Sequence, residues 1–303
     1  MSGSPGGDGS RDLAHRPDAA PETPEAPQHL LAPDLSGDAV GFAALLGKIA
    51  ADRHFVCQSY KEKCLRRRIA VRLRARGIDT YADYARLLDT DPAEYDKLVD
   101  TLTINVTKLF RNWETFAAIA RTVVPVLWDS PSSTLRIWSA GCASGEEAYS
   151  LAVLFHQFAD AHHQVARAGR IQVMGTDIDR ESLAAAHRAT YLDAAFADTP
   201  PDLRARYFSA GSPAMVDPEI RALVHFARHD LIRDPAPAGQ HLIACRNVVI
   251  YFGRDTQEEL FARFHSALVP GGFLVLGKVE TLLGPTRSLF APVDARERIF
   301  RRV

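Results

Sequence analysis

The chain has 303 residues, a length typical of about two domains. Its 36 lysines and arginines nearly balance 37 aspartates and glutamates, and this net charge of −1 argues against a bulk nucleic-acid binder. No run approaches the roughly 20 apolar residues that span a bilayer, so we expect no membrane insertion. Four cysteines without a C-x-x-C pair, and a polar N-terminus without an apolar leader, predict a reduced, cytoplasmic protein.

The N-terminal third divides into two parts. Residues 1–36 are rich in proline and poor in apolar side chains, which predicts a disordered tail. Residues 37–104 carry apolar side chains three to four positions apart, which predicts a small all-helical domain. We expect its second helix over 55–76, ended by Gly77, and a later helix that begins at Asp91-Pro92-Ala93-Glu94.

From about residue 135 short apolar runs alternate with helical stretches. This rhythm predicts an α/β domain with a parallel sheet covered by helices on both faces. The expected strands are 135–139, 171–176, 241–245 and 273–277, and the expected helices are 146–159, 180–188 and 256–268. Ligands of such sheets bind beyond the carboxyl ends of the strands, so we look for chemistry there.

The first strand ends in a loop of small residues, Gly141-Cys142-Ala143-Ser144-Gly145, followed by Glu146 and Glu147. The spacing is not that of a pyrophosphate cradle, and two carboxylates at a helix start would repel a phosphate. A tight turn is the alternative interpretation. The favoured ligand is a nucleoside without a pyrophosphate.

The next two strand ends also carry polar side chains. After the second strand, Asp177 is placed to hold ribose hydroxyls, whereas Asp179 is expected to cap the following helix. Asp230 could reach an adenine or cap a turn. The strand 241–245 delivers Arg246 and Asn247 to the same edge, and an apolar stretch ending in Tyr251 follows.

Two further segments stand out by charge and spacing. The junction Asn105-Val106-Thr107-Lys108-Leu109-Phe110-Arg111 interleaves polar and apolar side chains, and spacing alone favours a capped linker. Residues 61–76 hold eight basic residues against one glutamate. At 100° per residue, one side of this helix carries Lys61, Arg68, Arg72 and Arg76. The alternative is a solvated face, but we expect this side to attract an acidic partner.

Four of these segments, in order, resemble motifs of the CheR family, the chemotaxis receptor glutamate methyltransferases. They are the junction N-V-T-K-L-F-R at 105–111, W-S-A-G-C-A-S-G-E-E-A-Y-S at 138–150, G-T-D-I-D at 175–179 and C-R-N-V-V-I-Y-F at 245–252. The resemblance covers roughly residues 40–303. It implies a Rossmann-like class I methyltransferase domain over 105–303, dependent on S-adenosyl-L-methionine (SAM), behind the helical domain.

The resemblance also implies roles for individual residues. By its motifs, SAM, later released as S-adenosyl-L-homocysteine (SAH), is held by Asn105, Thr107, Arg111, Glu146, Asp177, Asp230, Leu231, Arg246 and Asn247. Arg111 and Tyr251 match groups that position the substrate carboxylate. The basic helix would meet the glutamate-bearing helices of methyl-accepting chemotaxis receptors. Because a sulfonium methyl is already activated, we expect no metal, and we expect a monomer.

Two positions depart from the family pattern. The strand after Pro270-Gly271-Gly272 ends in Lys278-Val279-Glu280, where many members have His-Ser-Glu. A small antiparallel insertion is expected around 205–228, and its segment 209–223 is short, which suggests docking without a receptor's C-terminal peptide.

Several alternatives stay open. They are a CheR-like methyltransferase of a pathway other than motility, a SAM-sensing docking module without catalysis, a nucleic-acid methyltransferase, for which the prolines after the fourth strand are missing, and a nicotinamide-dependent oxidoreductase, for which the glycine spacing is wrong.

Overall fold

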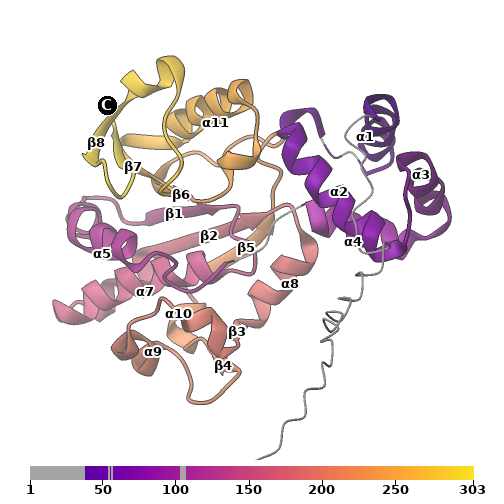
Figure 1. The fold of residues 1–303 in the computed structure, drawn as a ribbon. Helices are drawn as coiled ribbons and strands as arrows, with labels where there is room; N and C mark the ends of the chain where they lie inside the picture. Colours follow the sequence, from indigo (N-terminus) through magenta and orange to yellow (C-terminus); the bar gives the residue numbers. More distant parts are fainter. Residues whose placement is uncertain (1–37, 54, 56, 103–106) are drawn as a thin grey trace, which may run out of the picture.

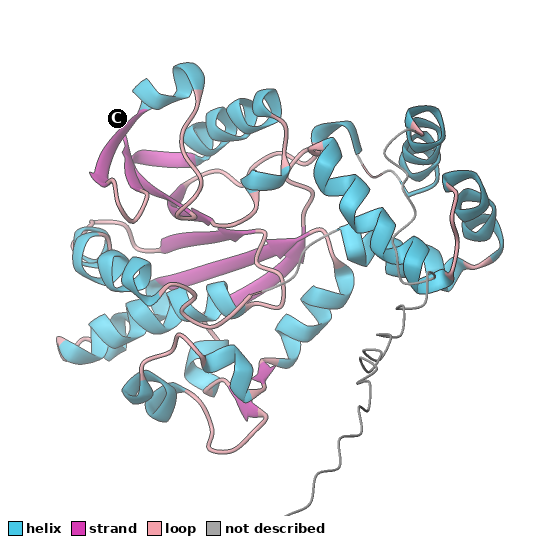
Figure 2. Ribbon diagram, in the orientation of Figure 1, coloured by secondary structure: helices cyan, strands magenta, loops and turns pink. Residues whose placement is uncertain are grey.

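The computed structural model describes residues 38–53, 55, 57–102 and 107–303 as two domains side by side (Figures 1 and 2). The predicted tail, 1–36, lies outside the described residues. The helical domain contains α1 (Ala39–Arg53), a 3-10 turn (Cys57–Ser59), α2 (Glu62–Arg76), α3 (Tyr81–Thr90) and α4 (Pro92–Leu102). Apolar side chains at helical spacing, such as Phe42, Leu65 and Tyr84, form one buried core in this domain.

The ends of these helices follow local sequence signals. Gly77 ends α2 in the left-handed conformation, as predicted. The Asp91 carboxylate accepts the N–H of Glu94 at 2.9 Å, which confirms the predicted start of α4. The predicted start of α2 at 55 is wrong, because Cys57–Ser59 form a separate 3-10 turn and the extended Lys61 bonds to the other domain.

The C-terminal domain is built on a seven-stranded sheet in the order β5-β2-β1-β6-β7-β9-β8. Its strands are β1 (Leu135–Ala140), β2 (Ile171–Asp177), β5 (Val224–Arg228), β6 (Gln240–Cys245), β7 (Leu268–Leu276), β8 (Phe290–Asp294) and β9 (Ile299–Arg302). The first five strands in this order are parallel, and β9 and β8 extend the sheet antiparallel. This confirms the predicted α/β domain and adds two antiparallel strands that were not expected.

Helices cover both faces of the sheet. They are α5 (Trp113–Thr122), α6 (Val124–Trp128), α7 (Glu146–Ala161), α8 (Arg180–Arg188), α9 (Pro201–Tyr207), α10 (Pro218–Arg221) and α11 (Arg254–Ala267). Consecutive residues of β1 point to opposite faces, so Ile137 joins the core beneath α5 and α7 and Trp138 joins the core beneath α11.

Three local expectations are corrected. The helix expected over 256–268 begins two residues earlier, at Arg254 after Gly253, and the N–H of Gly253 donates to the Ser59 carbonyl. Pro270-Gly271-Gly272 is not a turn before a strand but an irregular part of β7. A short antiparallel pair, β3 (Thr190–Tyr191) with β4 (Ala214–Met215), begins before the expected insertion, and β5 belongs to the main sheet.

The helical domain lies against the carboxyl ends of the parallel strands, beside α8 (Figure 1). The N–H of Lys61 donates to the Tyr251 carbonyl at 2.8 Å, and the N–H of Gly253 donates to the Ser59 carbonyl at 2.8 Å. These two bonds form a backbone bridge between the domains. The bridge places the first turn of α2 next to the sheet edge where ligands are expected.

Candidate active site

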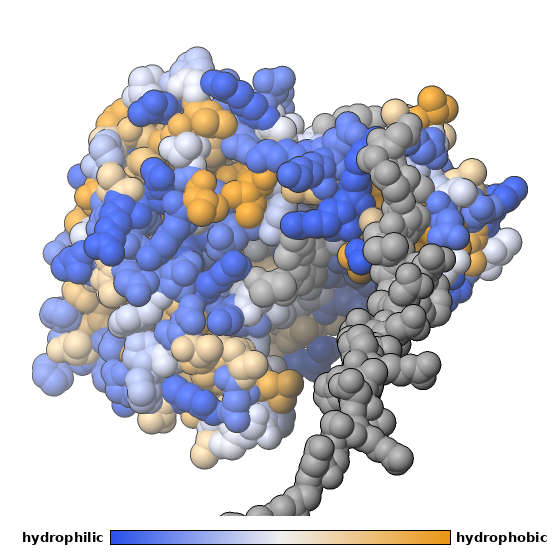
Figure 3. All heavy atoms as spheres, viewed as in Figure 1, coloured by the Kyte–Doolittle hydropathy of each residue, from blue (hydrophilic) through white to orange (hydrophobic). Residues whose placement is uncertain are grey.

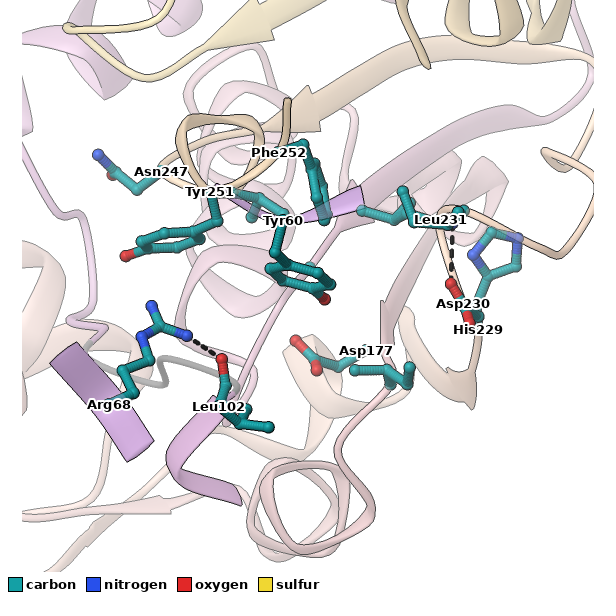
Figure 4. A pocket seen from close by; sticks show the side chains of 14 residues that line it. Tyr60, Arg68, Leu102, Asp177, His229, Asp230, Leu231, Asn247, Tyr251 and Phe252 are labelled. Carbon is teal, nitrogen blue, oxygen red and sulfur yellow. Dashed lines mark hydrogen bonds between the residues drawn. The ribbon is translucent and has the colours of Figure 1, made fainter. Parts of the chain in front are cut away.

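A cleft with two adjoining hollows lies at the carboxyl ends of β1, β2 and β6. The space of the larger hollow is about 600 Å³ and that of the smaller one about 430 Å³, and both open to solvent. Both are lined by Gly141, Asn247 and Val248, so these three residues form a shared wall. The larger hollow also takes Tyr60, Arg68 and Leu102 from the helical domain (Figure 4).

The shared wall depends on the absence of a side chain at Gly141. Its φ is +79°, and a Cβ atom there would lie 2.5 Å from a Val248 methyl. The N–H groups of Gly141 and Cys142 donate to the Thr176 carbonyl at 2.8 and 2.9 Å. The loop after β1 is therefore fixed to the end of β2 and presses against the segment after β6.

Asp177 lies where the sequence predicts a ribose-binding acid. It is buried, lines the larger hollow and accepts the N–H groups of Ala143 at 2.8 Å and Asp179 at 3.0 Å. Burial raises the pKa of Asp177, and these backbone bonds oppose the rise. The Asp179 carboxylate accepts the Glu181 N–H at 2.8 Å, which confirms its predicted helix cap.

Asp230 and Leu231 line the same hollow. The Asp230 carboxylate accepts the N–H of Ile232 at 2.8 Å and so stabilises the turn after β5. The same residue borders the cavity. Both interpretations left open for Asp230 are compatible with this position.

The smaller hollow is lined by charged groups in fixed partnerships. The Glu147 carboxylate accepts the Ser139 hydroxyl at 2.8 Å and lies 3.4 Å from Nη1 of Arg246. Nη2 of Arg246 donates to the Arg111 carbonyl at 2.7 Å. Burial raises the pKa of Glu147, and the Arg246 guanidinium acts against that rise. The Arg246 side chain is only 2% exposed, so the pair is held in a largely water-free place.

The structure distinguishes two neighbouring glutamates that the sequence could not. The buried Glu146 carboxylate accepts the Ser144 hydroxyl at 2.8 and 3.0 Å and lines neither hollow. The carboxylate that borders the smaller hollow belongs to Glu147. Its signal in the sequence was the second glutamate of the same motif.

The junction segment reaches the smaller hollow through Thr107 and Arg111. Asn105, the third predicted residue of this segment, lies outside the described residues. Tyr251 lines the larger hollow, so the two residues predicted to position a substrate carboxylate lie in adjoining hollows.

Sequence reasoning missed the role of Glu280, a buried carboxylate behind the shared wall. It accepts four backbone N–H groups, from Gly277 at 2.5 Å, Val248 at 2.9 Å, Asn247 at 3.0 Å and Ile250 at 3.3 Å. Asn247 has a φ of +61°, a conformation that these bonds help to hold. Burial raises the pKa of Glu280, and the four N–H groups oppose it. The signal was the glutamate retained in the Lys278-Val279-Glu280 triplet.

The predicted docking side of α2 does not form one exposed face. Arg68 is 5% exposed; its Nη1 bonds to the Leu102 carbonyl and its guanidinium lies 4.6 Å from the centre of the Tyr251 ring. Arg72 makes two hydrogen bonds to the buried Glu94 carboxylate, at 2.6 and 3.0 Å.

Helix α4 supplies the acids that the local sequence of α2 lacks. Arg76, which is exposed, pairs with Asp91 directly before α4 at 3.0 Å and with Glu94 of α4 at 3.8 Å. The exposed basic residues of α2 are Lys61, Lys63, Arg67, Arg74 and Arg76. Figure 3 shows hydrophilic side chains gathered over this part of the helical domain.

Across the described ranges, no helix is both long and apolar enough to cross a membrane. The same ranges hold no group of three His, Cys, Asp or Glu side chains that could bind a metal ion. The expectation of metal-free chemistry stays a prediction.

Comparison with known proteins agrees with this geometry. The family model described as the CheR methyltransferase all-alpha domain matches residues 41–103, and that of the CheR methyltransferase SAM binding domain matches residues 105–299. The "Chemotaxis protein methyltransferase" of Listeria innocua is 30% identical over 254 residues, 84% of this chain and 93% of that protein. "Chemotaxis protein methyltransferase 1" of Pseudomonas aeruginosa is 32% identical over 233 residues, 75% of this chain and 85% of that protein.

A third relative is much longer. An "Uncharacterized 104.1 kDa protein" of Rhodobacter capsulatus is 36% identical over 245 residues, which are 80% of this chain and only 25% of that protein. The resemblance carried by the four motifs is thus confirmed over both domains. The two matched models follow one another in the order of the fold, and this chain belongs to the CheR methyltransferase family.

Proposed function

We propose that this chain transfers a methyl group from SAM to glutamate side chains of chemotaxis receptors, forming glutamyl methyl esters. The observation that carries this proposal is the cleft itself. One hollow is bordered by Asp177 and Asp230, the other by the Glu147–Arg246 pair, and a single wall joins them.

Each hollow suits one end of SAM. Asp177 offers a fixed carboxylate to the ribose hydroxyls, with Asp230 and Leu231 at the adenine. In the smaller hollow Glu147 faces the cationic amino group, and Thr107 and Arg246 face the carboxylate. When bound, SAM supplies a sulfonium methyl group that needs no further activation.

The remaining task of the protein is alignment. A glutamate carboxylate is ionised at pH 7; its oxygen forms the new bond to the methyl carbon while the bond to sulfur breaks with its electron pair, and no proton moves. Holding the reactants in line is worth about 7–11 kcal/mol in favourable cases. We assign the holding of the carboxylate to the Tyr251 hydroxyl and Arg111.

Recognition of the receptor is assigned to α2. The exposed cations Lys63, Arg67 and Arg74 would attract an acidic helix, and Lys61 would extend this surface to the domain bridge. Arg68, Arg72 and Arg76, which the sequence placed on one docking side, take different positions. Arg68 would meet the incoming glutamate at the cleft, whereas Arg72 and Arg76 hold α2 to α4. We propose that the protein works as a cytoplasmic monomer.

The decisive experiment is methyl transfer from methyl-labelled SAM to receptor-bearing membranes, read as label released by base. We expect transfer by the full chain and at least a 100-fold loss in Tyr251→Phe combined with Arg111→Ala. Binding of SAH without any transfer would instead favour a SAM-sensing docking module. Transfer to membrane receptors of a signalling system unrelated to movement would favour the alternative pathway.

A second assay tests docking. Arg67→Glu with Arg74→Glu should abolish receptor methylation while SAH affinity stays unchanged. The matched control reverses charge at two exposed arginines on helices away from the helical domain, Arg121→Glu on α5 with Arg206→Glu on α9. Equal receptor methylation by both double variants would overturn the assignment of α2.

A further inference from the structure

Tyr60 reaches the larger hollow from the helical domain. It lies between the 3-10 turn Cys57–Ser59 and the start of α2. Its ring stacks on Phe55, with centroids 4.8 Å apart, and meets Phe252 edge-on at 5.0 Å. The backbone bridge flanks it on both sides, through Ser59 and Lys61. Tyr60 is therefore held firmly against the C-terminal domain.

The hydroxyl of Tyr60 points into the hollow toward Asp177 (Figure 4). Burial, and the nearby carboxylates of Asp230 and Asp177, raise the pKa of this phenol, so it stays a neutral donor. Tyr60 is half-buried, and its hydroxyl borders the space of the hollow, where a ligand can reach it. Among the described residues the Tyr60 hydroxyl has no protein partner, so its donor is available to a ligand. The hydroxyls of Tyr84, Tyr95 and Tyr149 bond to protein groups, whereas the buried Tyr207 hydroxyl has no partner but lines neither hollow.

Simple packing does not account for this arrangement. A phenylalanine would fill the same space between Phe55 and Phe252 without placing a hydroxyl beside two carboxylates. The hollow already offers a carboxylate acceptor at Asp177, and the phenol adds a donor facing the same space. A donor and an acceptor that converge on one cavity suit a ligand edge with hydroxyl groups, such as a ribose.

We propose that Tyr60 is a cofactor-binding residue supplied by the helical domain. Its hydroxyl hydrogen-bonds the ribose edge of the nucleoside held by Asp177, and its ring borders the nucleoside's apolar face. This inference rests on the proposed function for the identity of the nucleoside.

The bound nucleoside would then touch both domains. Helix α2 begins two residues after Tyr60, so occupancy of the cleft would also steady the first turn of the receptor-facing helix. A ligand that binds across an interface stabilises it by mass action.

The test measures SAH affinity of the full chain by calorimetry. Tyr60→Phe removes only the hydroxyl and should weaken SAH binding about 3–10-fold, the usual effect of one hydrogen bond. Tyr84→Phe is the matched control, since Tyr84 is a buried tyrosine of the same domain whose hydroxyl bonds to Glu94 at 2.7 Å. It should lower the melting temperature and leave SAH affinity unchanged.

A second readout follows the link between the domains. In the wild type, saturating SAH should slow amide hydrogen exchange in the first turn of α2, and in Tyr60→Phe this protection should shrink. If Tyr60→Phe binds SAH as tightly as the wild type, the role of Tyr60 is refuted. If Tyr60→Phe and Tyr84→Phe weaken SAH equally, Tyr60 acts only through the stability of the domain. If the wild type itself does not bind SAH, the proposed function fails instead.

Discussion

The larger hollow of the cleft is built by both domains, whereas the smaller hollow takes all its lining residues from the C-terminal domain. In the smaller hollow, Glu147 and Arg246 are paired with each other. Among the described residues, two buried nitrogens of Arg68 in the larger hollow have no protein partner, against one, Nε of Arg246, in the smaller hollow. The smaller hollow is thus held mainly by an ion pair within one domain, and the larger one is built by two domains and leaves more polar groups for a ligand.

From this contrast we expect the largest loss of stability when Arg246 is replaced. Arg246→Met would leave the buried Glu147 carboxylate without its counter-charge, and losing one partner of a buried pair costs about 3–5 kcal/mol. We expect a large fall in unfolding free energy by denaturant titration, with loss of SAH binding. Arg246→Lys keeps the charge but loses the hydrogen bond to the Arg111 carbonyl, so its unfolding free energy should lie between those of the wild type and Arg246→Met. Near-wild-type stability of Arg246→Met would show that the smaller hollow does not depend on this pair.

Glu280 tests the wall that the two hollows share. Glu280→Gln replaces one carboxylate oxygen by an N–H₂ group that faces backbone N–H groups, at about 1–3 kcal/mol of stability. Because the wall borders both hollows, we expect KM for SAM to rise and kcat to fall together in methylation assays. Glu297→Gln is the control, since Glu297 is buried and bonded to Thr115 at 2.6 Å but borders neither hollow. If Glu280→Gln and Glu297→Gln both lose stability and neither changes KM, Glu280 has only a packing role.

The smallest effect is expected at the interface between the domains. Burial, and the carboxylates of Asp179 and Glu181 on α8, raise the pKa of Asp100 on α4 to about 6. The folded state therefore binds this proton more tightly than the unfolded state, and stability is lost as pH rises from about 4 to 6. Asp100→Asn should raise the melting temperature at pH 8 and change it little at pH 4. An equal shift at both pH values would exclude this repulsion as the cause.

Much of the cleft could be predicted because strand ends are visible in the sequence. Asp177, Asp230 and Arg246 each follow a short apolar run, and parallel strands bring such ends to one edge. The positions of Arg68 and Glu147 could not be predicted in this way. Periodicity places Arg68 on a side of its helix, but only the packing of α2 against Leu102 and Tyr251 decides that this side is buried.

Adjacent residues in one motif set a second limit on what could be predicted from the sequence. Glu146 and Glu147 share a motif, and a helix turns 100° between them, so one faces Ser144 and the other the cleft. No local pattern marked Tyr60 as a site residue, because its position in the cleft depends on contacts with the distant segment 251–253. Long-range pairing of this kind leaves no local pattern.

The backbone bridge determines when, during synthesis, the cleft can form and bind its cofactor. Ser59 cannot form its bridge hydrogen bond until Gly253 has been synthesised. At about 5–20 residues per second, a ribosome needs roughly 10–40 s to make the chain between them. The helical domain can form its own core early. Its wall of the cleft closes only when synthesis is almost complete, so a nascent chain should acquire cofactor affinity late and abruptly.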